Sequence, residues 1–291
     1  MNSLLKVSAL LAGVAAAQGS GPYYTNGETG ATYNYRMYHE FRGLDSTGNL
    51  YNSEPANITN DVESESATVQ EGYLTSDSFA GDWNIMTWGS PASEEAPIRK
   101  QYSNQNVYVS RDEDGETHLT LRAYRNADFI SSGEFDSEIT NIFHASVNVR
   151  ARVRGDPGTC AGIFTYANGE NESDIEILTR DPETQIRYTN QPTVDDDGNE
   201  IPGASTIVDI PNGGVWSDWH DHRLDWTPEL SAWYLDAELV HTKTYGIPQE
   251  PSQIIFNMWG DGGKWWTADM EIGAAAYLEI QYIEIFYNLA E

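Results

Sequence analysis

The chain has 291 residues, with 16 Lys and Arg against 45 Asp and Glu, and a formal net charge of -29. This charge argues against nucleic acid and anionic membranes as partners, because both attract basic proteins. A single cysteine excludes an internal disulfide, and the length permits one large domain that needs no such crosslink.

The N-terminal segment has the pattern of a secretory signal peptide. One lysine precedes an apolar run of 11 residues, and Ala15-Ala16-Ala17 supplies small side chains for cleavage. We therefore expect residues 1–17 to be a signal peptide and the polar, Gly-rich residues 18–32 to be a flexible lead-in. The protein would then be secreted, to the extracellular space or the cell wall.

From about residue 73 the chain reads as short β-strands separated by turns. Residues 106–124 predict a hairpin that turns at Asp114-Gly115, and residues 141–155 alternate between apolar and polar side chains. Similar runs follow at 159–167, 172–179, 185–191, 205–210, 220–226, 231–240, 253–260 and 277–287. Many short strands without an amphipathic helix predict an all-β sandwich or barrel. We expect one domain, residues 33–291.

One of these strands carries three carboxylates on one face. Glu172, Asp174 and Glu176 alternate with Ile175 and Ile177, so an apolar face would turn inward and the acids outward. Three acids on one face cannot all ionise cheaply, so one should keep a proton as an acid while another stays charged as a nucleophile.

The acid pattern by itself is not specific. Same-face residues four apart have Cα atoms about 13 Å apart, and a concave sheet could bring the two Glu carboxyls close enough for a glycosidase. The same spacing also occurs at 61–65, 112–116 and 134–138. From the residues alone, a catalytic pair and a solvated strand face both stay open.

The stretch Glu172-Ser-Asp174-Ile-Glu176 resembles the E-x-D-x-E signature of family 16 of the glycoside hydrolases, in the form without a bulge residue. Segments 133–140, 186–192, 219–240 and 254–263 agree with the family in order, and the match runs from about residue 73 to 287. The resemblance implies a β-jelly-roll sandwich of two antiparallel sheets with a concave substrate cleft.

The resemblance also implies roles. Glu172 would be the nucleophile, Glu176 the acid/base and Asp174 the residue that tunes the pair. Further substrate contacts are expected at Glu138, Tyr166, Tyr188, Asn190, Asn257 and Trp259. The implied reaction is retaining endo-hydrolysis of β-1,3-glucan or mixed-linkage β-1,3(1,4)-glucan.

Two alternatives stay open. A cell-wall transglycosylase of the same family would transfer the glycosyl group to a second sugar, and a non-catalytic carbohydrate-binding jelly roll would need neither glutamate. No cofactor is required, and no metal site is expected. Residues 195–200 resemble a calcium loop but lack the Gly at position 6 and the Glu at position 12 of an EF-hand, so a structural calcium has no specific ligand set. We expect a monomer that acts on polysaccharide, with no nucleic acid and no membrane as partner.

Overall fold

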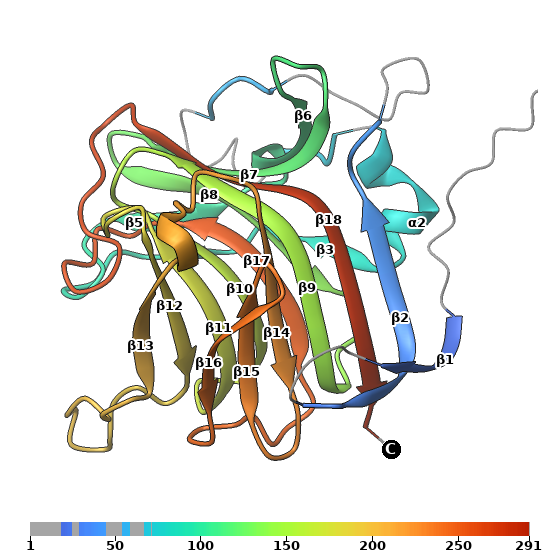
Figure 1. Cartoon of the computed structure of the whole chain (residues 1–291). Helices are drawn as coiled ribbons and strands as arrows, with labels where there is room; N and C mark the ends of the chain where they lie inside the picture. Colours follow the sequence, from blue (N-terminus) through green and yellow to red (C-terminus); the bar gives the residue numbers. More distant parts are fainter. Residues whose placement is uncertain (1–18, 25–28, 45–53, 59–66, 71, 291) are drawn as a thin grey trace, which may run out of the picture.

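The computed structural model describes residues 19–24, 29–44, 54–58, 67–70 and 72–290 (Figure 1). The expected signal peptide lies outside the described residues and stays a prediction. Helical structure in the described part is limited to α2 (Asp77–Ala80) and short 3-10 turns, and no helix there is long and apolar enough to cross a membrane.

Eighteen strands make up most of the described chain, as the alternating sequence predicts. They are β1 (Gly19–Tyr24), β2 (Thr32–Glu40), β3 (Trp83–Ile85), β4 (Gly89–Ser90), β5 (Arg99–Tyr102), β6 (Val107–Arg111), β7 (Thr117–Arg125), β8 (Phe129–Ser137), β9 (Ile142–Gly155), β10 (Cys160–Asn168), β11 (Asn171–Leu178), β12 (Gln185–Asn190), β13 (Ser205–Asp209), β14 (His220–Trp226), β15 (Ser231–Leu235), β16 (Glu238–Lys243), β17 (Gln253–Trp259) and β18 (Ala275–Leu289).

The strands form two layers. Antiparallel pairing in the order β13, β12, β11, β10, β17, β8, β3 makes the layer that we call the cleft sheet. The outer sheet runs β16, β15, β14, β9, β18, and both β7 and β2 pair along β18. Figure 1 shows β9 and β18 as two long neighbouring strands. Strand β8 also pairs with β5 and β7, so it connects the two layers.

Strand β9 shows how the sequence builds these layers. Val147, Val149 and Val153 are fully buried between the sheets, whereas Arg152 and Arg154 on the other face both form ion pairs with Glu279 of β18. Period-two alternation therefore places apolar side chains in the core and charged ones on the opposite face of the sheet. The expected hairpin is also present, because β6 and β7 pair across Asp114-Gly115.

The N-terminal segment differs from expectation. Residues Gly19–Tyr24 of the expected flexible lead-in form β1, which pairs antiparallel with β2. The Tyr23 ring stacks on Phe286 with centroids 5.2 Å apart. This aromatic contact gives a polar, Gly-rich segment a partner on the outer sheet.

Candidate active site

The register of the cleft sheet brings residues from distant parts of the chain into lateral rows. In the first row, Glu176 of β11 lies opposite Gly162 of β10. The row continues through Asn257 of β17, which lies between Gly162 and Glu134 of β8. Directly opposite residues of antiparallel strands share one face of a sheet. The second row is Asp174, Phe164, Ile255 and Asp136, and the third contains Glu172, Tyr166 and Gln253.

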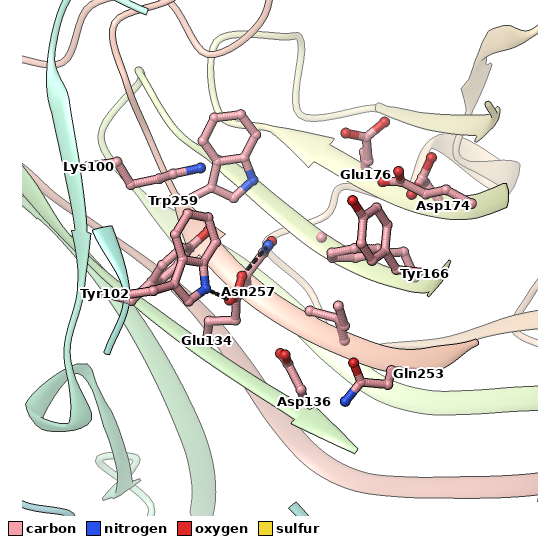
Figure 2. A pocket seen from close by; sticks show the side chains of 15 residues that line it. Lys100, Tyr102, Glu134, Asp136, Tyr166, Asp174, Glu176, Gln253, Asn257 and Trp259 are labelled. Atoms are coloured by element: carbon pink, nitrogen blue, oxygen red, sulfur yellow. Dashed lines mark hydrogen bonds between the residues drawn. The ribbon is translucent and has the colours of Figure 1, made fainter. Parts of the chain in front are cut away.

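These rows line a cleft of about 450 Å³. Figure 2 shows Asp174 and Glu176 on one side of it, with Trp259, Lys100 and Glu134 on the other. Its lining residues are Trp88, Lys100, Tyr102, Glu134, Asp136, Gly162, Phe164, Tyr166, Glu172, Asp174, Glu176, Gln253, Ile255, Asn257 and Trp259. The three carboxylates of the sequence signature therefore face one cavity.

Strand β11 carries the acids without a bulge. Its register with β10 is continuous from Cys160–Leu178 to Tyr166–Glu172, as the form of the signature predicts. On the core side, the Trp233 indole of β15 donates a hydrogen bond to the Asp174 carbonyl oxygen at 3.0 Å. A buried hydrogen bond of this kind fixes the position of the strand, and so of the side chains that it presents to the cleft.

The Glu176 carboxylate has a donor on each oxygen. Trp266 Nε1 donates to Oε1 at 3.0 Å, and Thr189 Oγ1 donates to Oε2 at 3.1 Å. Burial, assisted by the charge of Glu172, raises the pKa of Glu176 to about 7, although these hydrogen bonds act in the opposite direction. A carboxyl with a pKa near neutrality can both give and take a proton, as a general acid/base must.

The carboxyls of Asp174 and Glu172 affect each other's pKa. Asp174 is 2% exposed, and burial followed by the charges of Glu172 and Glu176 raises its pKa well above the usual range. Burial also raises the pKa of Glu172, but the hydrogen bond from Asp174 lowers it. Asp174 has the larger rise in pKa and is the more readily protonated of the two, which leaves Glu172 better suited to carry the negative charge of a nucleophile.

The opposite wall of the cleft carries a second polar group. Glu134 accepts hydrogen bonds from Trp88 Nε1 at 2.6 Å and from Asn257 Nδ2 at 3.0 Å (Figure 2). The Lys100 ammonium lies 4.2 Å from the centroid of the Trp259 ring. Aromatic faces beside fixed carboxylates are typical of sugar-binding clefts.

Three of the six expected substrate contacts lie in this cleft, namely Tyr166, Asn257 and Trp259. Glu138 does not, and this expectation is corrected. It is exposed beyond the end of β8, whereas Glu134 occupies the position opposite Asn257. The two residues are four apart in the sequence, so alternation does not distinguish them, and only Glu134 lies within β8 and pairs with β17.

The expectation for Tyr188 and Asn190 is also corrected. Tyr188 lies opposite Ile175 and Asn190 lies opposite Ser173, so both share the core face of the sheet. Tyr188 is 1% exposed and stacks on Trp233. The residues of β12 that share the face of the acids are Thr189 and Arg187, opposite Asp174 and Glu176.

The expected site residues do not include several that the structure places in or beside the cleft: Trp88, Lys100, Glu134, Asp136, Thr189 and Trp266. Two of these had a usable signal, because Glu134 and Asp136 belong to an acid-x-acid stretch that the sequence shows. Thr189 lies on the face of β12 opposite to the expected one, and no local pattern specifies that face. Trp88 and Trp266 come from loops and Lys100 from the short strand β5, whose positions no periodicity specifies.

One cluster among the described residues has metal-binding residue types at short range: Asp112, His118 and Glu279. Arg152 contacts both carboxylates of this cluster, and Arg154 contacts Glu279 as well. Two guanidinium groups already neutralise these acids, so the donor set does not fit a divalent cation. At residues 195–200, the Asp195 carboxylate accepts hydrogen bonds from its own turn.

Comparison with known proteins gives one family and one fold. A family model described as "Glycosyl hydrolases family 16" matches residues 95–282. A β-glucanase of Paenibacillus polymyxa is 28% identical over 232 residues, which cover 74% of this chain and 92% of that protein.

Solved structures of similar proteins show the same fold. The β-glucanase of Bacillus licheniformis has a TM-score of 0.56 at 24% identity, over 72% of this chain and 93% of that one. The catalytic domain of a laminarinase from Thermotoga petrophila has a TM-score of 0.54 at 20% identity, over 72% and 92%. The expected jelly-roll architecture is thereby confirmed.

Proposed function

The chain belongs to family 16 of the glycosyl hydrolases, and on that premise we propose that it is a secreted, retaining endo-β-glucanase for β-1,3-glucan or mixed-linkage β-1,3(1,4)-glucan. The observation that carries this proposal is the arrangement of three carboxylates on one strand in one cleft, where burial raises the pKa of Asp174 well above its usual range and that of Glu176 to about 7. The names of similar proteins include both β-glucanases and a laminarinase, which supports a β-glucan as substrate.

In the first step, Glu172 attacks the anomeric carbon while Glu176 protonates the leaving glycosidic oxygen. The bond to the leaving sugar breaks, and a glycosyl ester forms on Glu172. In the second step, Glu176 takes a proton from water, which attacks the same carbon and releases the sugar with its configuration retained.

The charge of Glu172 couples these two steps. While Glu172 is ionised, its charge helps to raise the pKa of Glu176 and so favours the protonated acid. Esterification removes that charge, so the pKa of Glu176 falls and its carboxylate becomes the favoured form. Glu176 therefore changes from acid to base when the reaction requires it.

The cleft suits a neutral polysaccharide. Five of its lining residues are acidic and one is a lysine, and the net charge of the chain is -29, so a polyanion would be repelled. The rings of Trp88, Tyr166 and Trp259 offer apolar faces to sugar rings. Secretion rests on the expected signal peptide.

The test is reducing-sugar release from laminarin, lichenan, xyloglucan and a galactan by wild type, Glu172→Gln, Glu176→Gln and Glu138→Gln. Substitution of either cleft glutamate should lower kcat by roughly 10²–10⁴-fold on the accepted glucan. Glu138→Gln is the matched control, because this exposed carboxylate lies outside the cleft. Full activity of Glu172→Gln or Glu176→Gln would reject the assignment.

Chemical rescue separates the two roles and tests retention. With azide and a substrate that has an activated leaving group, Glu176→Ala should yield the β-glycosyl azide and Glu172→Ala the α-glycosyl azide. Identical anomers from both variants would contradict a double displacement. Longer oligosaccharides from a labelled acceptor, in place of new reducing ends, would instead favour transglycosylation.

A further inference from the structure

The loop between β17 and β18 carries two adjacent tryptophans in opposite environments. Trp265 is 81% exposed. Trp266 is half-buried, and its indole N–H donates to Glu176 Oε1 at 3.0 Å. A loop residue that bonds to the general acid/base has an effect that its exposed neighbour cannot have.

Side chains from the turn between β11 and β12 and from β12 hold this loop in place. Arg180 Nη1 donates to the carbonyl oxygens of Lys264 at 2.8 Å and Trp266 at 3.2 Å. The Arg187 guanidinium lies 5.1 Å from the centroid of the Trp266 ring, and Asp181 binds Arg187 at 2.7 Å. The indole is therefore positioned from its backbone and from its ring face.

The donors to Glu176 are not equivalent. The Thr189 hydroxyl also lies 3.0 Å from Ser205 Oγ, so it can turn away from Glu176. The Cys160 thiol, 3.7 Å from Oε1, is a weak donor. An indole N–H can only donate, and its bond to an ionised carboxylate is stronger than its bond to a neutral carboxyl. Trp266 is thus the donor that most consistently favours the charged form.

Charged and titratable groups surround Glu176 on its neighbouring elements. They are Glu172 and Asp174 on its own strand, Arg187 on β12, Cys160 on β10, Lys100 on the opposite wall of the cleft, and Asp261 and Lys264 on the loop after β17. Of the loop residues, Asp261 accepts hydrogen bonds from Gly263 and Thr267, and the Lys264 ammonium lies over the Trp265 ring. Among the residues of this loop, Trp266 is the one whose side chain bonds to Glu176.

We propose that Trp266 is a positioning residue that orients the Glu176 carboxyl and stabilises its ionised form, so that Glu176 is ready to act as the base in the second step. This role rests on the proposed function of Glu176. In the first step the same hydrogen bond makes the Glu176 proton easier to release to the leaving oxygen. Trp266 acts through Glu176 and is not among the residues that line the cleft.

The test compares Trp266→Phe, which keeps a ring under Arg187 but removes the donor, with wild type and with the matched control Trp265→Phe. The upper limb of the pH profile of kcat/KM reports loss of the Glu176 proton. It should move up by roughly one pH unit in Trp266→Phe, because a hydrogen bond to an ionised group is lost. Trp265→Phe should leave it in place.

A second readout does not depend on hydrolysis. The protein labelled with ¹³C-glutamate at the carboxyl is titrated by NMR, and the Glu176 resonance is assigned by its absence in Glu176→Gln. The midpoint should rise in Trp266→Phe by the same amount as the kinetic limb. Wild type that hydrolyses no glucan would reject the proposed function, while the titration would still decide the role of Trp266.

An unchanged Glu176 midpoint in Trp266→Phe would overturn the proposal, as would a fall in kcat/KM by the same factor at every pH. If Trp266→Phe does not fold, Arg180→Gln takes its place, because it releases the loop carbonyl groups that hold Trp266. The midpoint should rise in that variant too, and an unchanged value there would have the same meaning.

Discussion

A buried histidine should make the protein lose stability in acid. His222 of β14 is 1% exposed and lies between Val149 of β9 and Leu235 of β15. Burial, followed by the nearby His220, lowers the pKa of His222 from 6.5 to about 3. Below pH 6.5 the unfolded chain binds a proton that the folded protein excludes, so stability falls with pH until the folded pKa is reached.

The size of the effect follows from the two pKa values. One pKa unit corresponds to about 1.4 kcal/mol. His222 should therefore lower the free energy of unfolding by about 2 kcal/mol when the pH falls from 7 to 5. His222→Leu has a similar volume and no titratable group. The variant should therefore lose about 2 kcal/mol less stability than wild type over this range.

Urea unfolding followed by tryptophan fluorescence at both pH values measures this difference. Comparing the change with pH in each chain cancels the contributions of the other titratable groups, including the cleft carboxyls. Leu224→Met is the control, because it changes packing on the same face of β14 without changing charge. The reasoning fails if His222→Leu and wild type lose equal stability between pH 7 and pH 5.

Further predictions concern the cleft. Because burial raises the pKa of Glu176 to about 7, kcat/KM should decline above that pH, and a profile that stays flat into the alkaline range would contradict this. Gly162→Ala should raise KM roughly tenfold or more, because the added Cβ would lie 2.6 Å from Asn257 Oδ1 and crowd that side chain. An unchanged KM in steady-state kinetics would contradict this prediction. Glu134→Ala should raise KM by about tenfold through loss of its two hydrogen bonds, whereas Glu138→Ala should not, and equal KM values would reverse that correction.

Features that depend on one strand at a time could be predicted from the sequence. Alternation along residues 141–155 gave the buried and exposed faces of β9, and alternation of Ile175 and Ile177 with the acids gave the face of β11. The spacing of Glu172, Asp174 and Glu176 matched a family signature, and the family model confirms the membership. These properties follow from the period of two in an extended chain.

Features that depend on the pairing of strands could not be predicted. The family resemblance implies that Tyr188 and Asn190 face the cleft, but the register with β11 turns Thr189 and Arg187 toward it instead. A shift of one residue exchanges the two faces of a strand, and no local pattern in β12 specifies which face meets the acids. The choice between Glu134 and Glu138, which have the same parity, depends instead on where β8 ends and on its pairing with β17.

The sequence by itself determined an all-β chain with three acids on one strand face. The tertiary structure decided which partners those acids have. Trp266 reaches Glu176 from 90 residues away, and Trp233 fixes the Asp174 backbone from 59 residues away. The pKa of a carboxyl depends on its burial and on nearby donors and charges, and these come from segments that only folding brings together.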